Sequence, residues 1–295
     1  GIFNTLTHEV IGDSMYIIKL LDGNFKQLWI VKKKSMQNRY IFRYADLDGS
    51  NEQEVELSTG DYSNKQFVNY SLSGDSIANM QPQSTSWDLQ LTKFNHPGMD
   101  YYIVTGFLAN DGVAISVFNA ADSATAAEAT IADTTEFTDS IAAIGNSWYK
   151  LQGMSMVPLD TIVYFVKLAS GDIYKLQTTY FESGYSGLGR VGIRKMKVSG
   201  TPDTEWHNDT LVMGAMYANE VYYKVDFDTK YQVPRNGWEI GFKTYLYTAS
   251  ISANTAMGVE LYTYPNADTS GWYSTTSTGP ALTAGTGLSL YPVPA

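Results

Sequence analysis

The sequence predicts an all-β protein built from two related, mostly antiparallel β modules. Three observations carry this prediction: an aromatic-rich composition, short apolar runs separated by Gly-containing turns, and an internal repeat. The 295 residues include 22 Tyr, 12 Phe and 6 Trp. Aromatic and β-branched side chains suit a pleated, half-buried surface better than a helix, so strands are expected to dominate.

Short apolar runs mark the expected strands in order along the chain. They cover 15–20, 25–31, 39–46, 67–72, 87–94, 101–108, 113–118, 164–168, 173–178, 190–198, 221–227, 238–247 and 258–264. Turns at Gly23 and Gly171 join two pairs of runs into hairpins, because Gly accepts the positive φ of a tight turn. Short helices are expected at 121–129 and 138–143. The polar segment 199–208 is expected to be a linker.

Charge and cysteine content exclude several classes of function. With 30 acidic and 20 basic residues, the formal charge is −10, which argues against nucleic acid or an anionic membrane as the main partner. The chain has no cysteine, so disulfides, thiolate metal sites and cysteine nucleophiles are excluded. No apolar run reaches the ~18 residues of a membrane span. No signal peptide begins at Gly1, so a secreted form would be the mature one.

Two half-modules recur along the chain. Residues 16–28 align with 164–176 without a gap at an offset of 148 (164 − 16), and 39–43 match 190–194. A second half recurs as well, in which Tyr70, Trp87 and Asn110 correspond to Tyr223, Trp238 and Asn254. Period-two alternation after each tryptophan places its apolar partners on the core side of a strand.

The order of these halves predicts one complete and one split module. Residues 62–198 form the complete module, 206–279 together with 1–48 form the split one, and 280–295 form a linker and tail. Three interpretations of the split stay open. The two ends of one chain meet, as in a circular permutant; the C-terminal half completes a neighbouring chain, giving a swapped dimer or a filament; or the segments are joined out of genetic order.

At these motifs the chain resembles the HmuY-like haem-binding proteins. The resemblance rests on Tyr70-Ser-Leu leading to Ser86-Trp87-Asp88-Leu89, on Asn110-Asp-Gly, and on the hairpin 164–176. The second module shows Val221-Tyr-Tyr, Pro234-Arg-Asn-Gly-Trp238-Glu-Ile and Gly258-Val-Glu-Leu-Tyr-Thr-Tyr-Pro-Asn266. The last eight residues, Leu288-Ser-Leu-Tyr-Pro-Val-Pro-Ala295, resemble the start of a type IX secretion sorting domain, with Val293 where Asn is usual.

The resemblance implies an all-β fold, a secreted or cell-surface location and no catalysis. It also implies a haem site in which two loop side chains, His or Met, bind the iron from opposite faces. Other proteins with this fold, including longer two-module ones with sorting signals, have no established haem activity.

Six side chains are candidate axial donors, since neutral imidazole and thioether sulfur suit iron. They are His8, His96, Met99, Met154, Met156 and Met257. In the complete module His96 or Met99 would pair with Met154 or Met156, and in the split module His8 would pair with Met257. The alternative interpretation is structural, because methionine commonly fills gaps in a core.

Two further features suggest other ligands. Residues 46–54 (DLDGSNEQE) resemble a calcium loop, because Asp-x-Asp-Gly gathers oxygen ligands on a tight turn; turn chemistry is the favoured interpretation. An aromatic group could form a flat sugar- or polymer-binding face, and its members are Tyr262, Tyr264, Trp272 and Tyr273. No Ser/His/Asp elbow and no glycine-rich phosphate loop appears, so an enzyme is not expected.

The sequence therefore predicts a secreted or cell-surface, non-catalytic protein that binds haem or a related porphyrin. The alternative is a structural or assembly subunit of a surface or extracellular polymer, whose split module is completed by a neighbouring chain. The expected partners are accordingly haem or another chain of the same protein, with neither nucleic acid nor a membrane span.

Overall fold

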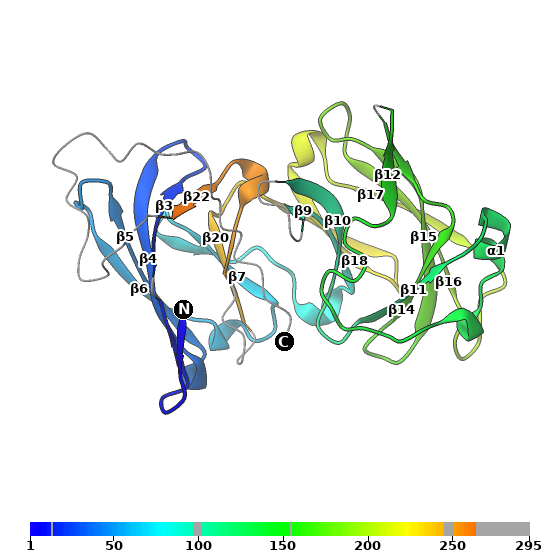
Figure 1. Ribbon diagram of the computed structural model, residues 1–295, viewed down its shortest axis with the longest axis horizontal. Helices are drawn as coiled ribbons and strands as arrows, with labels where there is room; N and C mark the ends of the chain where they lie inside the picture. The colour runs from blue at the N-terminus through cyan, green and yellow to red at the C-terminus, as the bar shows by residue number, and fades with distance from the viewer. Residues whose placement is uncertain (13, 97–101, 154, 245–250, 264–295) are drawn as a thin grey trace. The chain divides into compact units, whose positions relative to one another are not determined.

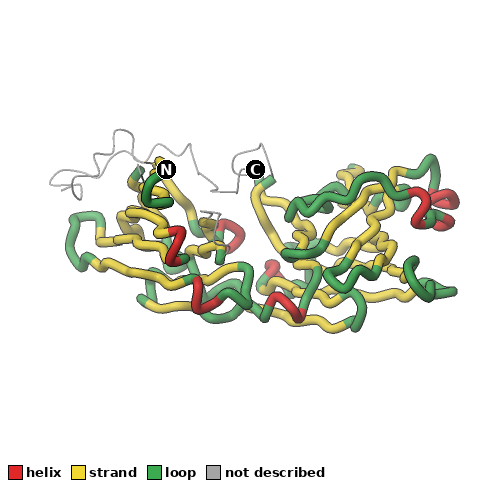
Figure 2. Tube along the Cα trace, turned by 90° about the horizontal axis from the view of Figure 1, so that it is seen from below, coloured by secondary structure: helices red, strands yellow, loops and turns green. Residues whose placement is uncertain are grey.

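The computed structural model describes residues 1–12, 14–96, 102–153, 155–244 and 251–263. Strands dominate this part of the chain, and every strand pairing in it that has a defined register is antiparallel. Figure 2 shows helical segments only as short turns between strands. The predicted all-β class is confirmed. Among the described residues no helix is long and apolar enough to cross a bilayer.

The chain divides into two compact units. Unit 1 comprises the described residues of 1–81, 95–103 and 235–263, and unit 2 comprises those of 82–94 and 104–234. Unit 2 is therefore nearly continuous in sequence. Unit 1 is assembled from both ends of the described chain (Figure 1).

Unit 1 holds two sheets. One has the order β1-β2-β4-β3-β22, with β5 pairing with β4 and β6; the other has the order β21-β20-β7-β8. The strands are β1 (Ile2–Asn4), β2 (Glu9–Ile11), β3 (Met15–Lys19), β4 (Phe25–Lys34), β5 (Arg39–Asp46), β6 (Gln53–Ser58), β7 (Phe67–Ser71), β8 (Ser76–Ala78), β20 (Ile240–Lys243), β21 (Ile251–Ala253) and β22 (Glu260–Thr263). Its helical turns are η1 (Ser35–Gln37), η2 (Gly60–Tyr62) and η6 (Thr255–Met257).

Unit 2 repeats this plan with sheets β11-β14-β15-β16-β17 and β10-β9-β18-β19, and adds the hairpin β12-β13. The strands are β9 (Leu89–Asn95), β10 (Ile103–Ala109), β11 (Ala114–Asn119), β12 (Tyr149–Gln152), β13 (Ser155–Pro158), β14 (Ile162–Lys167), β15 (Ile173–Glu182), β16 (Arg190–Lys197), β17 (His207–Val212), β18 (Asn219–Lys224) and β19 (Thr229–Pro234). Its helical segments are α1 (Ser123–Glu128), η3 (Ser84–Ser86), η4 (Ile131–Asp133) and η5 (Ala215–Tyr217).

The two hairpins of the predicted repeat have the same register. Tyr16 pairs with Leu28 in β3-β4, and Tyr164 pairs with Leu176 in β14-β15. Gly23 and Gly171 lie at the same position of the two equivalent turns, with φ of 86° and 91°. A residue with a side chain would be strained at these φ values. The next pairing of each unit carries a β-bulge at the same place, between Ile30 and Lys32 and between Thr178 and Tyr180. The repeat is therefore structural as well as sequential.

The two tryptophans of the repeat, Trp87 and Trp238, lie at equivalent positions in their units. Trp87 and Trp238 are buried, and the apolar residues that follow them enter the two hydrophobic cores. The acidic residue after each tryptophan accepts a backbone hydrogen bond from the end of the tyrosine strand: Val225 N donates to Asp88 Oδ2 at 2.8 Å, and Leu72 N donates to Glu239 Oε2 at 2.8 Å. This contact fixes which tyrosine strand pairs with which tryptophan strand.

A buried asparagine directly follows β10 in unit 2 and β21 in unit 1, the strands that come after the tryptophan strands β9 and β20. The Asn110 side-chain amide donates to Trp87 O at 2.8 Å, and that of Asn254 donates to Trp238 O at 2.9 Å. The backbone N–H of each asparagine also donates to the acidic residue's carbonyl, at 2.9 Å in both units. The two asparagines, predicted to be equivalent, thus make the same two hydrogen bonds in the two units.

The module boundaries differ from the predicted 62–198 and 206–279 plus 1–48. The Tyr70 strand β7 pairs with β20, which follows Trp238, and the Tyr223 strand β18 pairs with β9, which follows Trp87. Tyrosine and tryptophan motifs that are neighbours in sequence therefore belong to different units. The reason is that each tryptophan motif opens a module and each tyrosine motif ends one, so the units divide at 81/82 and 234/235.

The split module closes within the chain. β22 pairs with β3, with Tyr262 opposite Ile17, and the Lys19 ammonium lies 2.9 Å from the Glu260 carboxylate. Of the three interpretations left open by the sequence, this pairing corresponds to the circular-permutant one.

Several local expectations are corrected. The segment 138–143 is not a helix, because Thr138 forms a β-bridge with Ile115. The segment 199–208 is not a linker between modules: it connects β16 to β17 inside unit 2, and the Asp203 carboxylate accepts from Lys197 N at 2.8 Å. The helix expected at 121–129 is confirmed as α1, with Asp122 as its N-cap. The tail 280–295 lies outside the described residues.

Closure within one chain predicts the outcome of oxidative cross-linking. A Lys19→Cys/Glu260→Cys variant is expected to form an intramolecular disulfide, because the two residues are direct cross-strand partners and the chain has no other cysteine. Ala114→Cys/Lys167→Cys, the equivalent pair in unit 2, is the matched control. Non-reducing electrophoresis distinguishes a monomer from a linked dimer; dimers from the first pair alone would contradict closure within the chain.

A buried lysine predicts a rise of stability at alkaline pH. Lys33 is 1% exposed, and desolvation lowers its pKa from 10.5 to about 8. Between these values the unfolded chain binds the extra proton, so the free energy of unfolding is expected to rise with pH, by about 3 kcal/mol in total. Lys33→Met should remove the rise, and the exposed Lys150→Met should keep it. Urea titrations from pH 7.5 upward measure this; identical profiles for Lys33→Met and the wild type would refute it.

Candidate functional site

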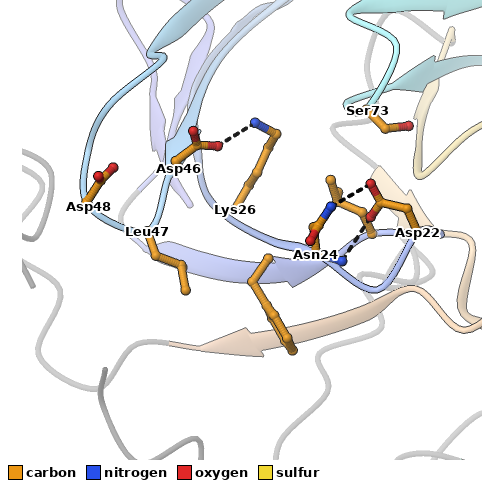
Figure 3. Close-up of a pocket in the computed structure, with 9 residues that line it drawn as sticks. Asp22, Asn24, Lys26, Asp46, Leu47, Asp48 and Ser73 are labelled. Carbon is orange, nitrogen blue, oxygen red and sulfur yellow. Dashed lines mark hydrogen bonds and ion pairs between the residues drawn. The ribbon is translucent and has the colours of Figure 1, made fainter. Parts of the chain in front are cut away.

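Unit 1 has a cleft of about 570 Å³ where three of its turns come together. We call it the turn-end cleft. The turns follow β3, β5 and β7, and Figure 3 shows their polar side chains around the opening. The cleft is lined by Leu20, Asp22, Asn24, Phe25, Lys26, Asp46, Leu47, Asp48 and Ser73. A volume of this size is within the range of small-ligand sites.

Turn chemistry fixes the side chains of the first two turns. Asp22 accepts hydrogen bonds from both Asn24 nitrogens, backbone and amide, at 2.9 Å each. Asp48 accepts from the backbone N of Ser50 at 2.9 Å and from its hydroxyl at 2.6 Å. These are Asx-type turns, in which the carboxylate is held by its own loop. Each of these two turns therefore holds one carboxylate in a fixed orientation.

An ion pair lies at the centre of the cleft. Lys26 Nζ is 2.8 Å from Asp46 Oδ1, as Figure 3 shows. The hydrogen bond from Lys26, followed by that from Asn51, lowers the pKa of Asp46 below its usual 3.8. Hydrogen bonds from Ser50 likewise lower the pKa of Asp48. Both carboxylates are therefore ionised at neutral pH and act as hydrogen-bond acceptors.

A buried tyrosine pair supports the cleft from the core side. The hydroxyls of Tyr44 and Tyr70 both donate to Asp75 Oδ1, the latter at 2.6 Å. These bonds, that from Tyr44 first, lower the pKa of Asp75, whereas burial raises the pKa of both tyrosines. Asp75 has a left-handed backbone with φ of 46°, which aspartate tolerates better than most residues.

Unit 2 keeps this support but exchanges two residues. Tyr223 donates to Asp228 at 2.8 Å, as Tyr70 does to Asp75, but Lys195 takes the place of Tyr44 and Tyr174 that of Lys26. The lysine–tyrosine contact survives the exchange, with the ammonium 5.6 Å from the ring centroid in both units. At the rim, Lys197 takes the place of Asp46 and pairs with Asp172 at 2.9 Å.

The calcium-like loop 46–54 does not assemble a cation site. Among the described residues no group of three or more His, Cys, Asp or Glu side chains could hold a metal ion. Asp46 forms an ion pair with Lys26. Glu52 and Glu54 form ion pairs with Arg43, with a Glu54 carboxylate oxygen 3.6 Å from Arg43 Nε. Three of the loop's four acidic side chains are thus in ion pairs, and the fourth, Asp48, accepts hydrogen bonds from Ser50.

His8 and Met257 are not brought together. His8 is exposed in the turn between β1 and β2, beside Glu9, which pairs with Lys34 at one end of β4. Met257 precedes β22, whose Glu260 pairs with Lys19 near the other end of that ten-residue strand. At ~3.3 Å per residue the two side chains are separated by ~30 Å along the sheet. The structure therefore gives no support to this pair, and the axial donors stay a prediction.

The remaining predicted donors are not gathered either. His96 falls in unit 1, with its ring 6.0 Å from that of Tyr102, whereas Met156 is half-buried on β13 in unit 2, opposite Leu151. No site inside one unit thus combines these two. Met99 and Met154 lie outside the described residues. The predicted pairs that include Met99 or Met154 thus fall outside the described residues, and haem binding stays a prediction.

Of the predicted aromatic face, only Tyr262 is described. Its ring lies 6.4 Å from that of Phe25, and its hydroxyl donates to Glu260. Tyr264, Trp272 and Tyr273 lie outside the described residues.

Most residues of the turn-end cleft are not predicted as a site from the sequence. The sequence predicts a turn around Gly23 and a calcium-like loop at 46–54, but not the proximity that β3-β4-β5 pairing gives to Asp22 and Asp46. The repeat contains a signal that could have pointed to this site. Its two copies agree in the strand residues but differ in the turn, where Asp22 and Asn24 correspond to Ser170 and Asp172.

Comparison with known protein families, with curated proteins and with solved structures finds no match for this chain. The resemblance to HmuY-like proteins and to a sorting domain therefore stays a prediction from the sequence.

Removal of the central ion pair predicts a shift in one titration. In a Lys26→Met variant the pKa of Asp46 is expected to rise toward 3.8, because the hydrogen bond from Lys26, the main cause of the lowered pKa, is lost. The ionised Asp46 stabilises the fold above that value, and this contribution disappears as pH falls. Carbon-detected NMR of the carboxyl group measures the pKa, with Lys65→Met as the control in the same unit. An unchanged Asp46 titration would contradict the assignment.

Proposed function

We propose that this chain is a non-catalytic binding protein that takes a saccharide in the turn-end cleft of unit 1. The observation that carries the proposal is the lining of that cleft: ionised carboxylates, an amide, a hydroxyl and an ammonium group surround one aromatic ring. The secreted or cell-surface location expected from the family resemblance belongs to the same proposal.

The chemistry of the lining suits a polyhydroxylated ligand. Each sugar hydroxyl both donates and accepts, so it needs acceptors such as Asp22 and Asp48 and donors such as Lys26 in one place. The apolar face of a sugar ring packs on an aromatic side chain, and Phe25 supplies one at the cleft. Charge-assisted hydrogen bonds to carboxylates are stronger than neutral ones.

The electrostatics favour binding over hydrolysis. Cleavage of a glycosidic bond requires one carboxyl group whose pKa is raised, so that it can donate a proton near neutral pH. The pKa values of Asp46 and Asp48 are both lowered by their hydrogen bonds. These two groups would accept hydrogen bonds from a ligand without transferring a proton to it.

Saccharide binding is tested with a panel of maltose, cellobiose, lactose and chitobiose. Titration followed by amide NMR is expected to move the resonances of Asn24 and Asp48 for at least one disaccharide. Asp22→Ala should weaken that binding about tenfold or more, because it removes a charged acceptor worth about 1.5–3 kcal/mol. Phe25→Ala gives an independent test that leaves the Asp22 turn intact.

The repeat supplies the matched control. Ser170 occupies in unit 2 the place that Asp22 has in unit 1, so Ser170→Ala should leave the affinity unchanged. If no disaccharide moves the two amides, or if Ser170→Ala weakens binding as much as Asp22→Ala does, the cleft is not the site. A shifted Soret band on haem addition would instead favour the haem prediction.

A further inference from the structure

The sheet β11-β14-β15-β16-β17 has one face in the core of unit 2 and one outer face. Strand alternation places Arg194 and Gly192 on the outer face, because Ile193 between them packs in the core. Their register partners on β17, Asn208 and Thr210, therefore point the same way. None of these residues lines the turn-end cleft, so the inference goes beyond the proposed function.

Two cations share one aromatic ring on the outer face. Lys175 Nζ lies 4.6 Å and the Arg194 guanidinium carbon 4.5 Å from the ring of Trp206, the residue directly before β17. A cation at this distance from an indole ring is attracted to it. Trp206 is half-buried, so part of its ring stays open to solvent. The ring is thus held on the sheet by two positive charges.

Neither cation has an anionic partner. Lys175 donates to the carbonyl oxygens of Ala127 and Ala129, at 2.8 and 3.0 Å. Arg194 donates from Nε and Nη2 to the Gln177 side-chain oxygen, at 3.0 and 2.6 Å. Within the described part of the chain neither side chain forms an ion pair. Burial, followed by the charge of Arg194, lowers the pKa of Lys175. Two neighbouring positive charges without a counterion would be stabilised by an anionic ligand.

The repeat shows which exchange leaves the arginine without an acid. Arg43 is the equivalent arginine of unit 1, and Glu52 and Glu54 both pair with it. Register places Glu54 where unit 2 has Asn208, and Glu52, two residues earlier, where unit 2 has Trp206. Unit 2 therefore keeps the arginine but replaces its two acids by an aromatic ring and an amide.

A second ring lies farther along the outer face. Tyr180 is 46% exposed and lies opposite Gly192, which in turn lies opposite Thr210. A Cβ at Gly192 would lie 2.9 Å from the Tyr180 Cβ, so glycine leaves the room that this ring needs. Thr210 is four residues after Trp206 (210 − 206), which is ~13 Å along an extended strand. Only an extended ligand can reach both rings.

We infer that the outer face of unit 2 binds an extended acidic polysaccharide, with sugar rings on Trp206 and Tyr180 and a uronate carboxylate on Arg194. The apolar face of a sugar ring packs on an aromatic side chain, and a guanidinium forms charge-assisted hydrogen bonds to a carboxylate. Asn208 and Thr210 offer amide and hydroxyl groups on the same face. The net charge of −10 argues against nucleic acid as the anionic polymer.

The test uses the full chain and hexagalacturonate, with the fully methyl-esterified form of the same oligosaccharide as the uncharged control. Amide NMR is expected to show shifts at Gly192 and Asn208 with the acid, and the ester should bind about tenfold or more weakly. Raising the ionic strength should weaken binding of the acid, because salt screens its contact with Arg194. Tyr180→Ala should weaken binding of hexagalacturonate but not of digalacturonate, which is too short to reach both rings.

Variants test the residues that distinguish the two units. Trp206→Glu/Asn208→Glu, which installs the acids of unit 1, is expected to abolish binding. Trp206→Ala and Arg194→Gln should each weaken it about tenfold or more. Two exposed residues of the same unit supply matched controls, Tyr185→Ala for the loss of a ring and Lys150→Gln for the loss of a charge. Both controls should leave the affinity unchanged.

Three results would overturn the inference: hexagalacturonate moves neither amide, the ester binds as tightly as the acid, or oligothymidylate of equal charge binds more tightly than hexagalacturonate. The last result would identify a nucleic-acid site instead. The first two comparisons use the unaltered chain, so they do not depend on the folding of a variant. Asp22→Ala should leave this binding unchanged, whatever it does to saccharide binding in the turn-end cleft, so the two proposals fail separately.

Discussion

A buried carboxylate after each tryptophan is the contact on which both units depend. Asp88 and Glu239 accept backbone hydrogen bonds from residues 137 and 167 positions away, and both side chains are almost fully buried. Because a buried carboxylate without its donor is strongly destabilising, each must meet a tyrosine-strand end. The two bonds thus join the tyrosine strand to the tryptophan strand within each unit, β18 to β9 and β7 to β20.

The two units conserve their interactions more closely than their residues. Lysine and tyrosine exchange places between Lys26/Tyr44 and Tyr174/Lys195, yet the ammonium-to-ring contact and the aspartate they serve persist. Away from this shared framework the units differ where packing allows it. One has an open polar cleft at its turns, and the other has a glycine beside its bulge. Two related scaffolds thus carry different surfaces.

The sequence was sufficient for the features set by local contacts. Turn glycines and alternating apolar residues predicted the β3-β4 and β14-β15 hairpins and their equivalence. Long-range pairing was not predictable in the same way, because Tyr70 is close to Trp87 in sequence but pairs with the strand after Trp238. The same holds for His8 and Met257, whose separation depends on the order of strands in the sheet and not on the sequence around each residue. Polar edge strands such as β6 and β17 lack the apolar alternation that reveals a strand.

Most of unit 2 lies, in sequence, between the two terminal segments of unit 1, and this order has a consequence during synthesis on the ribosome. Unit 2 has most of its chain in one stretch and can fold as soon as that stretch has emerged. Unit 1 must wait, because Lys19 meets Glu260 across 241 residues. Until β22 arrives, one edge of β3 lacks its partner, and an unpaired edge invites association with other chains. Nascent chains are therefore most vulnerable to aggregation after β3 has been translated and before β22 has.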